Sequence, residues 1–190
     1  MKIHRLHWGI LLAMPIFLLV PGLASAAVIT VNSNTDLRTP SDGFCELAEA
    51  IDNANQQTGV DVSGGDCTAG DVGPNDIAFN IPGGIQTIVI NSDMGVISSE
   101  IHVDGLTQDA GASCAPRNLY ISIDGNLSTQ KIFYFLPGSE NSTVRGLNIF
   151  GTTVAAIDIN TNSITVTCNN IGTDITGTSG APNANQDSGI

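Results

Sequence analysis

Residues 100–105 read Glu-Ile-His-Val-Asp-Gly, and residues 120–125 read Tyr-Ile-Ser-Ile-Asp-Gly. A third related run, Gly-Leu-Asn-Ile-Phe-Gly, occupies residues 146–151. Apolar and polar side chains alternate in each run, which is typical of a strand with one buried face. Return of the same short strand and turn after roughly 20 residues indicates a solenoid, in which stacked turns bury one another.

The alternation sorts the strand residues into two faces. Eight residues are predicted to point inward: Ile101, Val103, Ile121, Ile123, Leu147, Ile149, Ile164 and Val166. Six are predicted to point outward: His102, Asp104, Ser122, Asp124, Asn148 and Thr165. No helices separate these strands, so an all-β parallel β-helix is favoured over a doubly wound sheet. An antiparallel sandwich, which also uses short alternating strands, is the competing architecture.

One segment, Ser41–Gln57 (SDGFCELAEAIDNANQQ), has the spacing of an amphipathic helix. Its apolar stripe consists of Leu47, Ala50, Ile51 and Ala54, whereas Glu46, Glu49, Asp52 and Asn53 lie off that stripe. Ser41 or Asp42 is expected to cap the helix start. We expect a helix over about residues 44–57 to cover the open end of the solenoid, because that end exposes unpaired strand amides and an apolar cross-section.

The segment 1–26 has the pattern of a secretory signal peptide. Lys2 and Arg5 precede an apolar run, Trp8–Val20, and Ala24-Ser25-Ala26 fits a cleavage site. The alternative is an uncleaved anchor, but the run is shorter than the ~20 residues of a membrane span. We therefore expect a signal peptide at 1–26, a cap region at 27–75 and β-helix coils at 76–190. No later segment is apolar enough to cross a bilayer, so we expect no membrane span after signal cleavage.

Net charge and cysteine content bear on the partners of the chain and on the compartment in which it folds. Cleavage after Ala26 would leave 18 acidic and 4 basic side chains, a net charge of −14, which disfavours nucleic acid as a partner. The four cysteines of an exported chain are expected to form disulfides, and the sequence leaves three pairings open. Cys45 and Cys67 bracket the helix and its following loop, so we favour that pair, which leaves Cys114 with Cys168 by elimination.

Cys45-Glu46-Leu47-Ala48-Glu49-Ala50, which follows Asp42-Gly43, resembles the CSLREA motif, with Glu46 in place of Ser and Ala48 in place of Arg. The runs 103–108, 111–114 and 123–125 are similar to the first coils of exported bacterial proteins that carry this motif. The resemblance implies a domain after a signal peptide and before a right-handed parallel β-helix of the pectin-lyase-like class. It implies no particular activity.

Three outward positions are candidates for catalysis or metal binding. Asp104, Asp124 and Asn148 occupy comparable places in the repeated runs, so they form a candidate ligand face. A calcium-dependent lyase needs clustered carboxylates and a base, often Arg, and Arg145 is near in sequence. Turn formation by Asp-Gly explains the two aspartates better. Asp174 lies in an oxygen-rich loop that lacks the spacing of calcium solenoids, so we expect no cofactor, with calcium the one ion to consider.

These observations predict a secreted or cell-surface β-helix protein with a binding or structural, adhesin-like role and no catalytic site. Its expected partners are an extracellular glycan or a surface protein. The alternative is a polysaccharide lyase or hydrolase whose catalytic coils lie outside this chain. Because no terminal cap follows the last run, we expect this chain to be the N-terminal part of a longer protein.

Overall fold

A computed structural model describes residues 26–190. The predicted signal peptide, residues 1–26, lies outside the described residues except for Ala26. The described chain contains one α-helix, α1 (Leu47–Gln56), and one 3-10 helix, η1 (Gly105–Gln108). Its thirteen strands are β1 (Val28–Val31), β2 (Asn75–Phe79), β3 (Gln86–Val89), β4 (Ile101–Asp104), β5 (Ser113–Cys114), β6 (Arg117–Asn118), β7 (Ile121–Asp124), β8 (Lys131–Phe135), β9 (Thr143–Arg145), β10 (Leu147–Phe150), β11 (Ala155–Ile159), β12 (Thr165–Thr167) and β13 (Asn170–Ile171).

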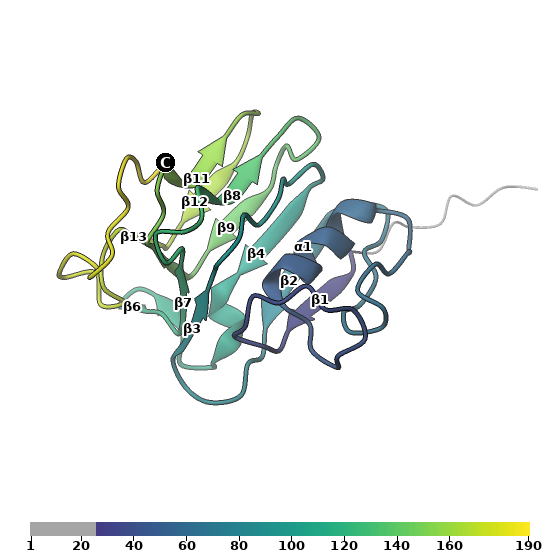
Figure 1. Cartoon of the computed structure of the whole chain (residues 1–190), viewed down its shortest axis with the longest axis horizontal. Coiled ribbons are helices and arrows are strands. Elements are labelled where there is room, and N and C mark those ends of the chain that lie inside the picture. Colours follow the sequence, from purple (N-terminus) through teal and green to yellow (C-terminus); the bar gives the residue numbers. More distant parts are fainter. Residues whose placement is uncertain (1–25) are drawn as a thin grey trace, which may run out of the picture.

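Three parallel sheets form the body of the molecule (Figure 1). A five-stranded sheet has the order β1-β2-β4-β9-β12, a four-stranded sheet has the order β13-β10-β7-β3, and a two-stranded sheet pairs β11 with β8. Every pairing in these sheets is parallel; the β5–β6 hairpin forms the remaining, antiparallel pair. The antiparallel sandwich is therefore excluded.

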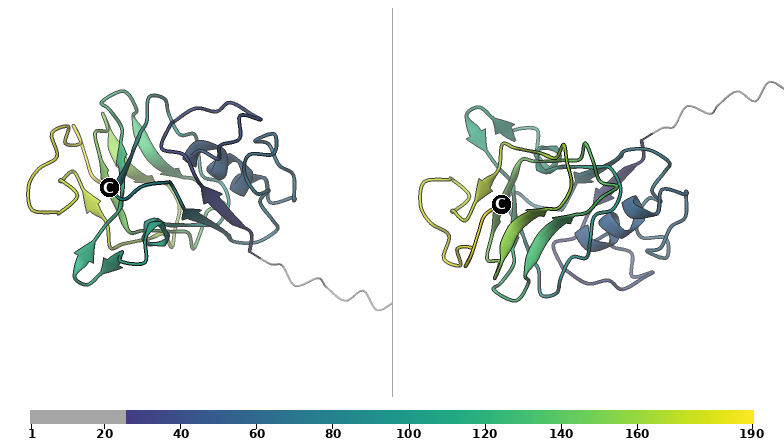
Figure 2. Two further views of the ribbon diagram at one scale, coloured as in Figure 1. Left: turned by 90° about the horizontal axis from the view of Figure 1, so that it is seen from below. Right: turned by 90° about the horizontal axis from the view of Figure 1, so that it is seen from above.

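The chain visits the three sheets in a repeating order. It passes from β4 to β7 to β8, then from β9 to β10 to β11, each time one strand further along each sheet. The last pass, β12 and β13, ends at Ser188, which bridges to Ala155 of β11. The stacked parallel sheets are consistent with a β-helix-like arrangement. Figure 2 shows α1 at one end of the stack and the C-terminal segment toward the other in both turned views.

The core lies between the sheets and follows the predicted alternation. Ile101, Val103, Ile121, Ile123, Leu147 and Ile149 are all fully buried, as predicted. Burial of each such side chain contributes about 2 kcal/mol. Ile164 and Val166 also pack on this core but are only partly buried, because they belong to the last pass and are covered from one side.

The predicted repeat interval is wrong. An interval of roughly 20 residues would stack β4 on β7, but these two strands belong to different sheets. Strand register instead pairs Ile121 of β7 with Leu147 of β10. His102 of β4 instead pairs with Thr143 of β9. These two strands are far apart in the sequence because residues 105–120, which contain η1 and the β5–β6 hairpin, are inserted between β4 and β7.

The helix α1 covers one end of the core (Figure 1). It packs against β1 and β2, and its predicted stripe of Leu47, Ala50, Ile51 and Ala54 is almost completely buried. In the last turn of the helix, the Ala54 carbonyl accepts from the Ser99 hydroxyl at 3.0 Å. The helix is shorter than the predicted 44–57, and within residues 26–190 no helix has the length and hydropathy to span a bilayer.

The polar positions of α1 differ from prediction in two respects. Glu46 occupies the N-cap position, whereas Ser41 donates to the Gly64 carbonyl and Asp42 caps the amide of Phe44 in the preceding turn. Glu46, Glu49 and Asn53 were expected off the apolar stripe, yet all three are buried. The preceding segment and the loop after the helix fold over that side and supply polar partners to Glu46 and Asn53.

Two disulfides, Cys45–Cys67 and Cys114–Cys168, join the pairs favoured from the sequence. The first ties the start of α1 to the loop that follows it. The second ties the insertion of residues 105–120 to the residue after β12. Two disulfides in one small chain indicate an oxidising environment.

Candidate functional site

The predicted ligand face is not formed. Asp104 lies on β4 in the five-stranded sheet, whereas Asp124 and Asn148 lie on β7 and β10 in the four-stranded sheet. Even these two do not face each other, because register pairs Asp124 with Phe150 and Asn148 with Ser122. The interval of roughly 20 residues wrongly stacked Asp104 on Asp124, and Asn148 stands two positions before the residue that matches Asp124, so the expected strip has no counterpart in the fold.

The outer face of the four-stranded sheet is covered over β7, β10 and β13. Ser122 and Asn148, both predicted to face solvent, are buried. In the amide orientation that satisfies both ends, Asn148 donates to the Thr173 carbonyl at 3.0 Å and accepts from the Ser122 hydroxyl at 3.2 Å. Arg117 of the β5–β6 hairpin donates to Asn170 at 2.8 Å. The insertion and the segment after β13 therefore occupy this face.

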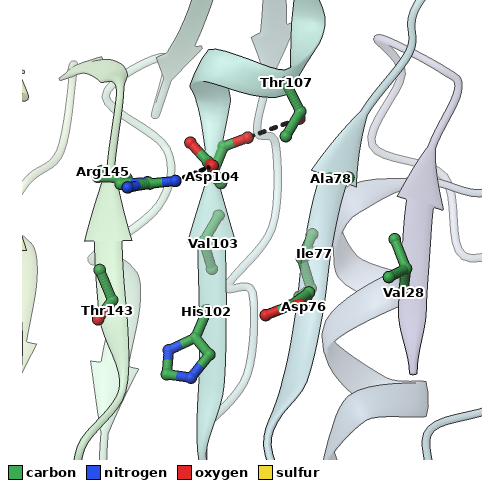
Figure 3. Close-up of a pocket in the computed structure, with 10 residues that line it drawn as sticks. All are labelled: Val28, Asp76, Ile77, Ala78, His102, Val103, Asp104, Thr107, Thr143 and Arg145. Atoms are coloured by element: carbon green, nitrogen blue, oxygen red, sulfur yellow. Dashed lines mark hydrogen bonds and ion pairs between the residues drawn. The ribbon is translucent and has the colours of Figure 1, made fainter. Parts of the chain in front are cut away.

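The outer face of the five-stranded sheet remains open and is hollowed into a groove of about 410 Å³. Figure 3 shows the groove with α1 behind the sheet, so the groove and the helix lie on opposite faces. Ten residues line it: Val28, Asp76, Ile77, Ala78, His102, Val103, Asp104, Thr107, Thr143 and Arg145. We call this surface the groove.

Two rows of side chains cross the groove from strand to strand. Register places Val28, Asp76, His102 and Thr143 in the first row. Ala78, Asp104 and Arg145 form the second row, two positions further along each strand. Neighbours in a row are about 4.8 Å apart, the spacing of paired strands. The groove therefore presents regularly spaced polar groups, with the apolar Val28 and Ala78 at one side.

Asp104 and Arg145 form an ion pair in the second row (Figure 3). Arg145 Nη2 donates to Asp104 Oδ2 at 2.6 Å, while Asp104 Oδ1 accepts from the Leu106 amide at 3.0 Å and caps η1. Asp104 thereby makes a turn, as the sequence indicated, and also holds the guanidinium. Its hydrogen bond raises the pKa of Arg145, which keeps this group cationic.

The first row carries the uncommitted polar groups of the groove. Among residues 26–190, the Asp76 carboxylate makes no side-chain hydrogen bond or ion pair, and His102 Nε2 lies 3.8 Å from Glu100 Oε1. Asp76 and His102 are partners in register on adjacent strands. Within the described residues, no group of three His, Cys, Asp or Glu side chains is arranged to hold a metal ion.

No family model, curated protein or solved structure matches this chain. The resemblance to the CSLREA family therefore rests on the residues quoted above, and the groove has to be interpreted from its own chemistry.

Sequence reasoning placed His102 and Asp104 outward but missed the groove as a site. Asp76 and His102, which pair on adjacent strands, are separated by the same number of residues as the paired Ser122 and Asn148. This shared spacing was the sequence signal that could have placed Asp76 beside His102. The partnership of Asp104 with Arg145 was hidden because the insertion lengthens the chain between them.

Proposed function

We propose that this chain is an exported, right-handed parallel β-helix protein that binds an extracellular glycan in the groove. The two disulfides and the signal-like pattern of residues 1–26 support export. The repeated passage through three parallel sheets supports the β-helix, and right-handed crossovers are the rule for parallel strands. The buried stripe of α1 supports its role as the cap.

One observation carries the binding role. On the four-stranded sheet the outward residues Ser122, Asn148 and Asn170 are buried under other segments. The five-stranded sheet instead keeps Asp76, His102, Thr143, Asp104 and Arg145 together in an open groove. Neighbouring side chains within a row, about 4.8 Å apart, suit a ligand with a regular repeat of similar length, such as a sugar chain. An open sheet face offers no backbone edge, so a peptide strand would gain no main-chain pairing there.

Charge favours a neutral or amine-bearing glycan over a uronate. Asp104 already neutralises Arg145, and Asp76 remains as an unpaired carboxylate among the described residues. The chain as a whole carries 18 acidic and 6 basic side chains, which repels polyanions at long range. Because Asp104 already balances the charge of Arg145, the groove offers an acidic sugar no uncompensated cation.

The alternative function, polysaccharide cleavage, has one observation in its favour. The groove holds two carboxylates, a histidine and an arginine, which are residue types of glycan-active enzymes. Against it, the raised pKa of Arg145 makes that residue a poor base. Incubation with polygalacturonate, with and without calcium, separates the two functions: unsaturated or shortened products would support the enzyme and contradict a purely binding role.

The binding proposal predicts that Thr143→Met weakens glycan binding about tenfold. Thr143 lines the groove, and a longer side chain there would occupy space needed by the ligand. Thr165→Met is the matched control, because Thr165 follows Thr143 in the same row on β12 but does not line the groove. Binding is measured by calorimetry with oligomers of glucosamine, glucose and galacturonate.

We expect glucosamine or glucose oligomers to bind the wild type and the Thr165 variant alike, and galacturonate oligomers to bind neither. Equal loss in both variants would show that the groove is not the binding site. Preference for galacturonate would contradict the charge argument while leaving the groove as the site.

A further inference from the structure

Glu46 and Glu49 form a buried pair of carboxyl groups at the start of α1. Their residues are 1% and 3% exposed. The Glu46 amide donates to Glu49 Oε2 at 3.5 Å, and the Thr35 hydroxyl donates to Glu46 Oε1 at 2.8 Å. The other oxygen of each carboxyl, Glu46 Oε2 and Glu49 Oε1, is buried and has no donor among the described residues.

An ionised carboxylate only accepts hydrogen bonds, so two ionised groups here would leave both oxygens unsatisfied. A single proton on the pair supplies the missing O–H donor and removes one of two like charges. The surrounding charges are also negative: Asp66, on the loop after the helix, disfavours ionisation of Glu49, and Asp42 lines the same cavity as Glu46. Arg38, the cation on the segment before the helix, is paired with Asp52 at 3.0 Å and donates to the Met94 carbonyl.

We propose that Glu46 and Glu49 share one proton and act as a pH-operated latch that holds the cap helix on the core. While the proton is present, the pair joins the segment before α1 to the first turn of the helix. When the proton leaves, two buried like charges repel each other and the first turn loosens. The proposal is independent of the groove and of its ligand.

A cavity beside the pair gives the latch access to solvent. It measures about 440 Å³ and lies between residues 32–46 and residues 81–86. Glu46 lines it together with Thr35, Phe44 and Pro82. A proton can therefore exchange through the cavity, and the preceding segment has room to move when the pair ionises.

Burial, followed by the hydrogen bond with Glu46 and the neighbouring negative charges, raises the pKa of Glu49 from 4.5 to about 7. The folded chain then holds a proton that the unfolded chain releases, so the latch stabilises fully below about pH 4.5. That stabilisation is lost as pH rises through 7. A shift of this size corresponds to a ratio of folded to unfolded chain that falls on the order of a hundredfold between pH 5 and pH 8.

The experiment follows denaturant unfolding of the whole chain from pH 5 to pH 8, with the disulfides intact. We expect the hundredfold fall in wild type and a flat profile in Glu49→Gln, whose amide donates permanently to Glu46. Glu46→Ser, which keeps the capping box that residues 46 and 49 already form but removes one carboxyl, should also be flat. Hydrogen exchange of residues 46–56, corrected for intrinsic rates, should accelerate at pH 8 in wild type alone.

Carbon-13 NMR of the Glu49 carboxyl keeps the proposal testable if a variant fails to fold. A midpoint near pH 7 in wild type supports the shared proton, and a midpoint near 4.5 overturns it. Equal unfolding midpoints at pH 5 and pH 8, or the same pH-dependent fall in Glu49→Gln, would also overturn it.

Discussion

Replacement of Leu47 by Asp is expected to lower the free energy of unfolding by about 5 kcal/mol, a large share of the stability of a typical domain. Leu47 is 1% exposed and is the largest side chain of the α1 stripe together with Ile51. The substitution removes its packing on the end of the core and places a charge there without a partner. Chemical denaturation followed by near-ultraviolet circular dichroism measures the loss.

Leu37→Asp is the matched control, because Leu37 is a 55% exposed leucine on the segment before the helix. We expect it to change the free energy of unfolding by less than about 0.5 kcal/mol. A Leu47→Asp protein as stable as the control would show that α1 does not seal the core.

Loss of the Cys114–Cys168 disulfide, by replacement of both residues with Ser, is expected to cost about 4 kcal/mol. The bond joins residues with a sequence separation of 54. Its removal raises the entropy of the unfolded chain, and this gain is larger for a longer loop. The cost also has a structural part, because the bond holds the insertion of residues 105–120 near the last strands, where Arg117 contacts Asn170.

The Cys45–Cys67 pair provides the comparison. Its sequence separation is 22, so the same reasoning gives about 3 kcal/mol for its loss. Unfolding midpoints of the two double variants, each measured with the other disulfide intact, test this order. A Cys114/Cys168 variant with the wild-type midpoint would contradict the view that the insertion is part of the stable fold.

The inward-facing side chains could be predicted because the alternation of apolar and polar residues is a local property of the sequence. Inward residues such as Ile121 and Ile123 are apolar at every second position, and a strand places such residues on one face whatever lies beside it. The stripe of α1 was predictable for the same reason, with a period of 3.6 instead of 2.

Strand pairing could not be predicted with the same success. The runs at residues 100–105 and 120–125 look alike, but they lie in different sheets, and the true partner of Asp104 is Arg145. Two strands that follow one another in different sheets, such as β4 and β7, have the same local pattern as two strands that pair in one sheet, such as β7 and β10. An insertion between them changes which runs align, and no local signal marks it.

The sequence alone determined which side chains face the core and where the helix α1 lies. The tertiary structure alone decided which outward residues meet solvent. Asn148 and Glu49 are polar residues on predicted outer faces, yet distant segments cover them, whereas Asp76 and His102 remain in the open groove. Burial of one face follows from hydrophobic periodicity, but the covering of the other depends on where loops distant in sequence come to rest.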